Sequence, residues 1–409
     1  MGKKIKEIKV LLLSYDNNSG AGRLSERIYS SLSKNVKCDY QYLVNSKKKF
    51  LKIGKINSSK GFNYIKRKIN GLMFKLSFNN NPYFKSPSIF PSNLSDEINK
   101  SNYDIIHISW INEFLSIEDL GRIKKPIVWS VCDMWPFTGY LHYCDYGKNS
   151  DWRKKNFKKS SFDFNKFNIN RKLKNWKHSD ITMVAPCNWM VDCLKGSIVF
   201  HKSKIFKIPH PVNQTIFKPL NKNNLRKKYK LPKNKILILF NCHRGINDER
   251  KGWKYFEEAN KLTSSKYEIV VIGQKKIEDY DDSKRKIHWF GKIEGERKVS
   301  EIMNCVDLVT IPSQIDNLPQ VGLEAQSCGK PVVSFNTNGL CDLVEHKSDG
   351  YLAKTKNIHD LARGIDWIIK NNRKRKISIK CLKKAKKLYG SNTISKQYLS
   401  LYNKILEKK

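Results

Sequence analysis

Two acidic side chains stand eight positions apart in the segment IPSQIDNLPQVGLEAQSCGKPVVSF, residues 311–335. Asp316 and Glu324 bracket a stretch that we expect to form a short helix, with Asn317 as its N-cap and Pro319 in its first turn. Ionised carboxylates act only as hydrogen-bond acceptors. One acid can therefore accept from sugar hydroxyls at the start of the helix, and the other from a ribose diol at its far end.

The stretch DLVTIPS, residues 307–313, precedes this helix and has the composition of a buried strand. Gly329 suits the C′ position after the helix. In open α/β sheets, ligands bind at the carboxyl ends of the strands, where a helix N-terminus favours a phosphate. Eight helical residues rise about 12 Å, which is comparable to a diphosphate plus a ribose. An ordinary capped helix with a surface glutamate is the alternative interpretation.

Alternating strand-like and helix-like segments indicate what positions these residues. The N-terminal series contains apolar strand-like runs at residues 8–16, 103–110, 125–133 and 180–186. Three prolines in residues 208–220 suggest an interdomain connection, after which a second such series begins. The alternation predicts an α/β protein with two Rossmann-like, doubly wound parallel-sheet domains that face a cleft. We place these domains at residues 1–210 and 211–385.

The C-terminal segment, residues 386–409, is predicted to be a helix that packs back toward the N-terminal domain. Its apolar residues fall on one helical face, which must pack against another surface. These residues are Ile394, Tyr398, Leu401, Tyr402 and Ile405.

Two segments fit the alternation poorly. Residues 145–177 are polar, basic and aromatic without a clear period. Residues 47–78 mix lysines with aromatic side chains, a combination that predicts docking on anionic lipid. A solvated insert is the alternative for residues 47–78.

The composition limits the classes of protein that fit. The 409 residues carry a formal net charge of +42, which favours anionic partners, although the lysines are spread along the whole chain and a compositional bias is an equal explanation. No apolar run approaches the roughly 20 residues that cross a bilayer, so we expect a cytoplasmic protein. The ten cysteines are scattered, with no CxxC pair and no Cys/His cluster at zinc spacing, and we expect no metal site.

The segment from Asp316 onward resembles the C-terminal signature of glycosyltransferase family 4, whose members are retaining, metal-independent GT-B enzymes that use nucleotide sugars. The family pattern is an acid, seven residues, a glutamate and then A-x-x-x-G-x-P-V-V, and it reads here as Asp316, Glu324 and AQSCGKPVV. Residues 339–353, GLCDLVEHKSDGYLA, are similar to the family's continuation. The likeness extends to ERKGW and CDMWPFTGYLHYC and looks like that of bacterial envelope-polysaccharide transferases of the colanic-acid type.

The resemblance implies roles for the residues at the end of the second series. Glu324 would bind the nucleotide ribose. Asp316 would bind the donor sugar, with Asp in place of the family's usual, longer Glu. Backbone N–H groups near Asn317 and Leu318 would hold the diphosphate.

The resemblance also implies an Arg and a Lys that stabilise the departing diphosphate. Lys251 in ERKGW matches the Lys, with a solvated lysine as the alternative interpretation. Arg244 in NCHRG is the better match to the Arg, and Arg250 is the second candidate.

The glycine loop SGAGR, residues 19–23, follows the first predicted strand. Gly20 and Gly22 allow the backbone to approach a ligand closely. By itself such a loop is an ordinary tight turn. The resemblance implies a place beside the donor phosphate and the acceptor.

One position departs from the family pattern. Many relatives carry His-Asp before MWPFTG, and this chain has Cys132 and Asp133 there. The family's His hydrogen-bonds to the reacting sugar, and a thiol is a weaker donor. Asp133 stays a candidate catalytic residue, whereas we expect His107 and His142 to be ordinary core or surface histidines.

Three functions remain open. The resemblance implies a glycosyltransferase that moves a sugar from a nucleotide diphosphate sugar to a glycan or lipid-linked saccharide in cell-surface polysaccharide synthesis, without a cofactor and with docking at the inner face of the membrane as an option. Cys132 leaves a catalytically impaired GT-B protein that binds a glycan or a partner enzyme as the alternative. The charge raises a nucleic-acid binder, but the scattered lysines and the absence of a recognised motif argue against specific nucleic-acid binding.

Overall fold

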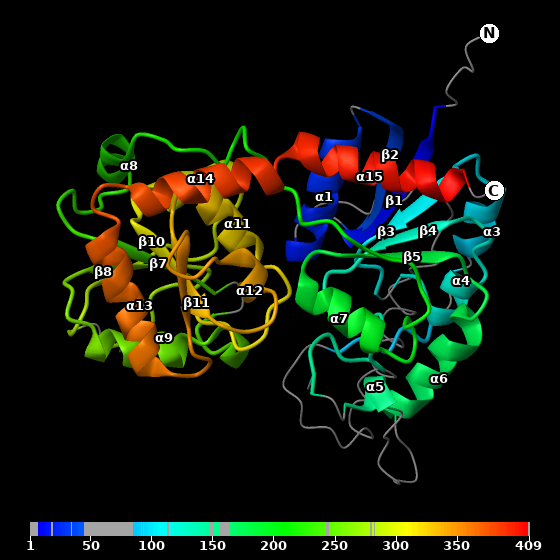
Figure 1. The fold of residues 1–409 in the computed structure, drawn as a ribbon, viewed down its shortest axis with the longest axis horizontal. Coiled ribbons are helices and arrows are strands. Elements are labelled where there is room, and N and C mark those ends of the chain that lie inside the picture. The colour runs from blue at the N-terminus through cyan, green and yellow to red at the C-terminus, as the bar shows by residue number, and fades with distance from the viewer. Residues whose placement is uncertain are drawn as a thin grey trace. The chain divides into compact units, whose positions relative to one another are not determined.

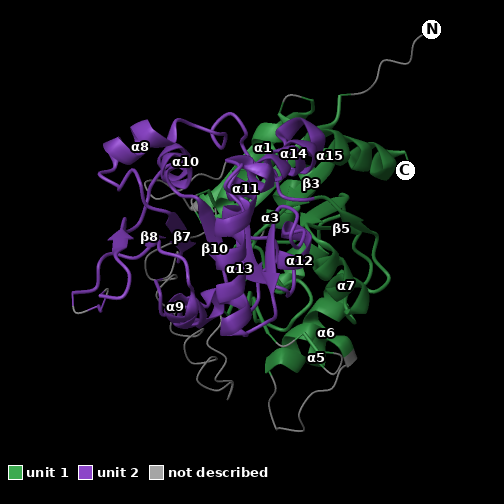
Figure 2. Ribbon diagram, turned by 60° about the vertical axis from the view of Figure 1, so that its left-hand side comes forward, with its two compact units in different colours: residues 1–208, 395–409 green, residues 209–394 purple. Residues whose placement is uncertain are grey.

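The computed structural model describes residues 7–44, 85–154 and 164–407, apart from residues 18, 34, 91, 93, 113, 145, 148, 149, 243, 244, 279 and 282. The chain divides into two compact units (Figure 2). Unit 1 comprises residues 1–208 and 395–409, and unit 2 comprises residues 209–394. Each unit is built on a six-stranded parallel sheet with flanking helices, which confirms the predicted fold class (Figure 1).

The sheet of unit 1 has the strand order β2-β1-β3-β4-β5-β6. Its strands are β1 (Lys9–Asp16), β2 (Lys37–Val44), β3 (Ile105–Ile108), β4 (Ile127–Ser130), β5 (Ile181–Ala185) and β6 (Ile205–Lys207). Its helices are α1 (Gly20–Leu32), α3 (Leu94–Lys100), α4 (Ile117–Gly121), α5 (Asp151–Lys154), α6 (Phe164–Trp176) and α7 (Asn188–Gly196). The run Val10 to Leu13 is buried on both faces of the sheet, as expected of a parallel strand covered by helices on each side.

The sheet of unit 2 has the order β12-β11-β10-β7-β8-β9. Its strands are β7 (Leu237–Asn241), β8 (Glu268–Ile272), β9 (Ile287–Trp289), β10 (Leu308–Ile311), β11 (Val332–Phe335) and β12 (Gly350–Ala353). Its helices are α8 (Lys222–Lys228), the 3-10 helix η1 (Glu249–Lys251), α9 (Trp253–Leu262), α10 (Glu296–Cys305), α11 (Gln320–Ser327), α12 (Leu340–Leu343), α13 (Ile358–Asn371) and α14 (Lys376–Leu388).

Helix α15 (Ser391–Leu406) returns the chain to unit 1, as predicted, and all five apolar residues of the predicted face are buried. Tyr402 and Ser130 hydrogen-bond the two ring nitrogens of His107, at 2.6 and 2.7 Å. The Tyr398 hydroxyl lies 2.7 Å from the Ser130 hydroxyl. Burial lowers the pKa of His107 to about 3, so this histidine is a neutral core residue that ties α15 to β3 and β4.

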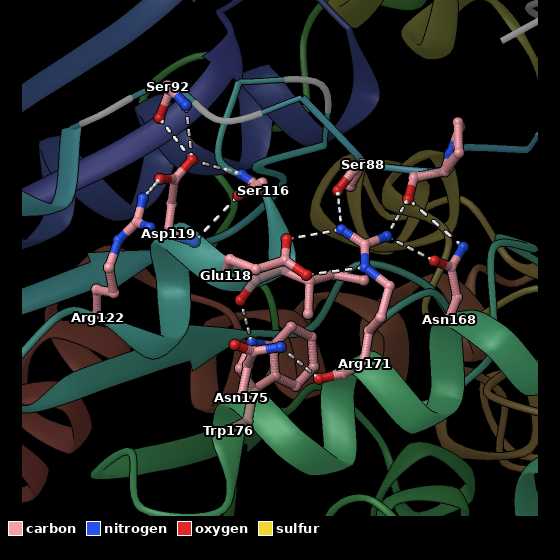
Figure 3. A network of polar contacts seen from close by, with 12 residues as sticks. Ser88, Ser92, Ser116, Glu118, Asp119, Arg122, Asn168, Arg171, Asn175 and Trp176 are labelled. Atoms are coloured by element: carbon pink, nitrogen blue, oxygen red, sulfur yellow. Dashed lines mark hydrogen bonds and ion pairs between the residues drawn. The ribbon is translucent and has the colours of Figure 1, made fainter. Parts of the chain in front are cut away.

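Residues 145–177, which show no clear period in the sequence, contain helix α6. Its buried positions include Phe164, Asn168 and Lys172, which are spaced four residues apart, and the polar residues on this buried face hide its helical period in the sequence. The Arg171 guanidinium of α6 forms a two-point contact with Glu118 of α4, at 2.8 and 2.6 Å (Figure 3). The Arg171 guanidinium also donates to the backbone carbonyls of residues 87 and 88.

Residues 47–78 lie outside the described residues, and their predicted contact with lipid stays a prediction. None of the helices in the described ranges is both long enough and apolar enough to cross a membrane.

Candidate functional site

The residues predicted to bind a nucleotide gather at the carboxyl ends of the strands of unit 2, which we call the edge of this sheet. Strands β7 and β10 are neighbours there, and the strand order reverses at this pair. A small hollow at their carboxyl ends is lined by residues of these two strands, of the loop after β10, of η1 and of α11: Phe240, Asn241, Lys251, Thr310, Ile311, Pro312, Ser313 and Val321. Such a reversal point is where doubly wound sheets bind ligands.

Lys251 reaches this edge because η1 is fixed at both ends. The Asp248 side chain accepts from the Arg250 N–H at 3.2 Å and caps the turn. Gly252 then adopts a left-handed conformation, with φ of 75°, and a Cβ there would lie 2.0 Å from the Pro312 carbonyl oxygen. Only glycine therefore permits this turn to pack against the loop that follows β10.

Asp316 lies between two cations in that loop. Its Oδ2 accepts from the Lys251 ammonium at 2.7 Å and lies 3.4 Å from the Arg250 guanidinium. Burial alone would raise the pKa of Asp316, but the two cations hold it below its usual value. Burial lowers the pKa of Lys251, and Arg250 lowers it further, whereas Asp316 and Asp248 oppose that shift.

The expected helix after this loop is α11, but its start differs from the prediction. The N-cap is Pro319, not Asn317, and α11 begins at Gln320. The reason is steric, because a residue before proline is pushed into an extended conformation, which keeps Leu318 out of the helix. Asp316 therefore lies in the loop four residues before α11, and only Glu324 lies within the helix.

The end of α11 follows the prediction. Gly329 is left-handed, with φ of 71°, and occupies the C′ position after the C-cap Cys328. The Lys330 N–H donates to the Ala325 carbonyl at 2.8 Å, and the Gly329 N–H donates to the Gln326 carbonyl at 3.0 Å. These two bonds form a Schellman motif, which turns the chain into β11.

The other predicted donor-side residues lie on the same loop and helix. Asn317 and Leu318 are buried directly after Asp316. Glu324 is 8% exposed, and a carboxylate buried to that extent requires polar partners. The same edge of unit 2 thus contributes Lys251, Asp316, Asn317, Leu318 and Glu324. Arg244 lies outside the described residues. Arg250, the second candidate for that role, lies beside Asp316.

The predicted glycine loop of unit 1 is the first turn of α1 instead. The Ser19 hydroxyl caps the helix by accepting from the Gly22 N–H at 3.0 Å. A Cβ at Gly22 would lie 2.2 Å from Oδ1 of Asp16, so this glycine allows α1 to pack closely on the end of β1. Around Gly20, no heavy atom of the described residues lies within 4 Å of such a Cβ. Of the two glycines, Gly20 is the one that leaves space for a ligand.

Asp133 is bound to a histidine that sequence reasoning set aside. The Nδ1 atom of His142 lies 2.6 Å from Oδ2 of Asp133. Its Nε2 atom lies 2.9 Å from the Asn112 amide nitrogen and 2.9 Å from the Ser86 hydroxyl. An imidazole that donates from Nδ1 to Asp133 and accepts at Nε2 satisfies these contacts. Three separate segments meet in this cluster, namely residue 86, residue 112 and the loop that carries Asp133 and His142, so spacing within the loop could not have indicated it.

Lys172 of α6 holds the loop that carries Asp133 and His142. Its ammonium donates to the carbonyls of Trp135 at 2.5 Å and Thr138 at 2.8 Å. The nitrogen also lies 3.8 Å from the centroid of the Trp135 ring. Burial lowers the pKa of Lys172 well below its usual value. The Lys172 side chain therefore supports this loop from the interior of unit 1.

The described residues contain no group of three or more His, Cys, Asp or Glu side chains placed to hold a metal ion. The cations of the unit 2 edge are instead side chains, Lys251 and Arg250, which suit a phosphate or diphosphate group.

Residues 221–387 match the family model described as glycosyl transferases group 1. The N,N'-diacetylbacillosaminyl-diphospho-undecaprenol alpha-1,3-N-acetylgalactosaminyltransferase of Campylobacter jejuni is 26% identical over 164 residues, which are 38% of this chain and 42% of that protein. This chain therefore spans less than half the length of that relative. An uncharacterized glycosyltransferase of Methanocaldococcus jannaschii, MJ1607, is 21% identical over 83% of this chain and 86% of its own length.

The structure of Anabaena Alr3699/HepE in complex with UDP and glucose superposes with a TM-score of 0.62 at 15% identity. The match covers 97% of this chain and 100% of that one. A likeness at this identity concerns the fold, which is the two-unit GT-B arrangement of parallel sheets. Over residues 221–387, the chain is similar to the group 1 glycosyl transferases.

Proposed function

We propose that the protein is a retaining, metal-independent glycosyltransferase of family 4 that transfers a sugar from a nucleotide diphosphate sugar to a glycan or lipid-linked saccharide in cell-surface polysaccharide synthesis. The observation that carries the proposal is the cluster of Lys251, Arg250 and Asp316 at the β7–β10 edge of unit 2. The match to group 1 glycosyl transferases covers the same part of the chain.

The donor binds with its diphosphate at the start of α11, near the backbone N–H groups of Asn317 and Leu318. Its ribose diol donates to Glu324, one turn into the helix. Lys251 and an arginine, Arg244 or Arg250, stabilise the negative charge that develops on the diphosphate as it departs. Charge placed in advance on a leaving group is commonly the largest single contribution to catalysis.

Transfer breaks the bond between the anomeric carbon and the diphosphate oxygen and forms a bond from the acceptor oxygen to the same face of the sugar. The acceptor proton passes to the departing phosphate oxygen. The products are the glycoside and the nucleoside diphosphate, and no protein nucleophile takes part. The residues needed are therefore those that bind the diphosphate and orient the acceptor.

The acceptor binds on unit 1, near Gly20 and Asp133. His142 fixes the Asp133 carboxylate, which then accepts a hydrogen bond from a hydroxyl of the reacting sugars. This pair answers the objection raised by Cys132, because it supplies an oriented polar group next to the altered position. A catalytically impaired binding protein remains the second candidate, and Cys132 is the observation that favours it.

The donor site is tested by nucleotide binding and turnover. We would screen UDP-, GDP- and ADP-sugars by thermal shift and then measure nucleotide release with a lipid-linked acceptor. Glu324→Ala should weaken donor binding by about 10- to 100-fold, since a buried hydrogen bond to a charged group contributes about 1.5–3 kcal/mol.

Glu258→Ala is the control, because among the described residues Glu258 forms its ion pair with Lys261, in a half-exposed contact on α9. It should leave donor affinity unchanged. An unaltered donor affinity in Glu324→Ala would contradict the proposed ribose contact. If none of the sugar nucleotides raises the melting temperature of the protein, the proposed enzymatic activity is contradicted.

A further inference from the structure

The Asp316 carboxylate is committed to protein cations. Its side chain is 9% exposed, that of Lys251 19% and that of Arg250 16%. Both cations approach the same oxygen, Oδ2. These contacts differ from the role that the sequence resemblance implied, in which this acid binds hydroxyls of the donor sugar.

We propose that Asp316 is a positioning residue for the diphosphate, which it serves by holding the Lys251 ammonium and the Arg250 guanidinium in place. This inference rests on the proposed function, because it assumes that a nucleotide diphosphate binds at this edge of unit 2. The inference assigns Asp316 to the diphosphate of the donor and not to its sugar.

The backbone around the three side chains is fixed independently of any ligand. The Gln314 N–H donates to the Arg250 carbonyl at 2.9 Å, and the Gln314 side chain donates to the Glu249 carbonyl at 2.8 Å. The Asp316 carbonyl accepts from the Gly339 N–H at 3.1 Å, which joins this loop to the segment after β11. Rigid supports of this kind keep a short aspartate side chain within reach of both cations.

The acid at this position is shorter than the one usual in the resembled family. Aspartate is one methylene shorter than the glutamate usual at this position of the resembled family, so it reaches less far from the loop. In this chain it stops at Lys251 and Arg250.

The charges around Lys251 explain why the acid is needed. Burial and Arg250 both favour the neutral amine, and Asp316 and Asp248 are the acids that oppose them. The nearby Cys242 adds no charge, because burial raises the pKa of its thiol to about 12. Without Asp316, Lys251 would be less fully protonated and less well oriented toward an anion.

Net charge alone predicts the opposite result. Replacing an acid by a neutral amide makes the site more positive, which would strengthen the binding of any anion. A loss of affinity for a nucleoside diphosphate is instead what the role of Asp316 in holding the cations predicts. The two explanations therefore differ in sign.

The experiment titrates UDP, GDP and ADP, which lack the sugar, into the wild-type protein and into Asp316→Asn by calorimetry. The nucleotide that binds the wild type should bind Asp316→Asn about tenfold more weakly, with Asp316→Glu restoring most of the affinity. Asp281→Asn removes the same charge from an exposed turn of unit 2 and should have no effect.

A pH series gives a readout that a purely structural role would not move. Lys251 binds an anion only while protonated, so affinity falls as the pH rises through its pKa. Asp316→Asn lowers that pKa further, and its loss of affinity should therefore begin at a lower pH than in the wild type. Lys251→Gln, which lacks the titrating group, should not show this shift, and Asp316→Asn should weaken binding little further in the Lys251→Gln background.

Two results would overturn the inference separately from the proposed function. If Asp316→Asn binds the nucleoside diphosphate as tightly as the wild type but loses turnover or affinity for the sugar nucleotide, Asp316 contacts the sugar. If the Asp316→Asn and Lys251→Gln losses are additive, Asp316 does not act through Lys251. A wild-type protein that binds none of UDP, GDP and ADP would instead overturn the donor site itself.

Discussion

The two units use the same edge of the same kind of sheet in different ways. In unit 2, the carboxyl ends of β7 and β10 carry an ionic cluster of Lys251, Arg250 and Asp316. In unit 1, the edge beyond β4 carries a hydrogen-bonded pair, Asp133 and His142, surrounded by aromatic and amide groups. One edge suits an anion, and the other suits hydroxyl groups.

The two clusters also differ in how far the sequence alone could predict them. The unit 2 cluster comes from two short segments, ERKGW and the loop before α11, and each has a local pattern. The unit 1 cluster draws on residues 86, 112, 133 and 142, which only the folded sheet brings together. The first could be indicated by spacing, and the second could not.

The largest expected effect lies on the ionic edge. Lys251→Met removes a cation from the departing diphosphate and should lower turnover by about 10²- to 10³-fold, the loss typical of one preorganised electrostatic contact. Lys254→Met, an exposed lysine of α9, is the matched control. Turnover would be measured as nucleotide release at saturating donor, and a loss equal to that of the control would remove Lys251 from the mechanism.

The hydrogen-bonded edge should respond less strongly. His142→Ala removes one buried hydrogen-bond partner each from Asp133, Asn112 and Ser86, which should cost about 1–3 kcal/mol of stability. Turnover should fall by about tenfold, because the Asp133 carboxylate loses its orientation. His201→Ala, an exposed histidine of unit 1, should change neither quantity.

The measurements for His142→Ala are a melting temperature and a turnover rate at a temperature where both proteins are folded. Unchanged turnover with a lowered melting temperature would mean that His142 supports only the fold. The ionic and hydrogen-bonded edges would then differ in function as well as in construction.

The smallest expected effect is that of restoring the family's histidine. Cys132 is a neutral thiol, because burial raises its pKa, and its sulfur lies 3.7 Å from the Ser130 carbonyl oxygen. Cys132→His should change turnover by no more than about threefold, since a thiol contributes only a weak hydrogen bond and His142 already orients Asp133. A gain of more than tenfold over Cys132→Ser would favour the impaired binding protein.

Several elements of the donor edge could be predicted because their causes are local. The C-terminal glycine of α11, Gly329, and the buried strand β10 follow from short patterns. The start of α11 was misplaced by two residues, since the restriction that Pro319 puts on Leu318 outweighs the capping preference of Asn317. Gly22 was assigned to a ligand loop, whereas its close contact with Asp16 depends on how α1 lies on β1.

The amino-acid sequence by itself determined the two doubly wound sheets and the acids and cations of unit 2, because apolar runs, glycines and prolines act on their immediate neighbours. Only the tertiary structure decided that Asp316 meets Lys251 and that His142 meets Asp133. The first pair forms where two strands distant in sequence end side by side, and the second forms because the loop after β4 folds back on itself. Burial at both places requires each polar group to find a partner that no local spacing specifies.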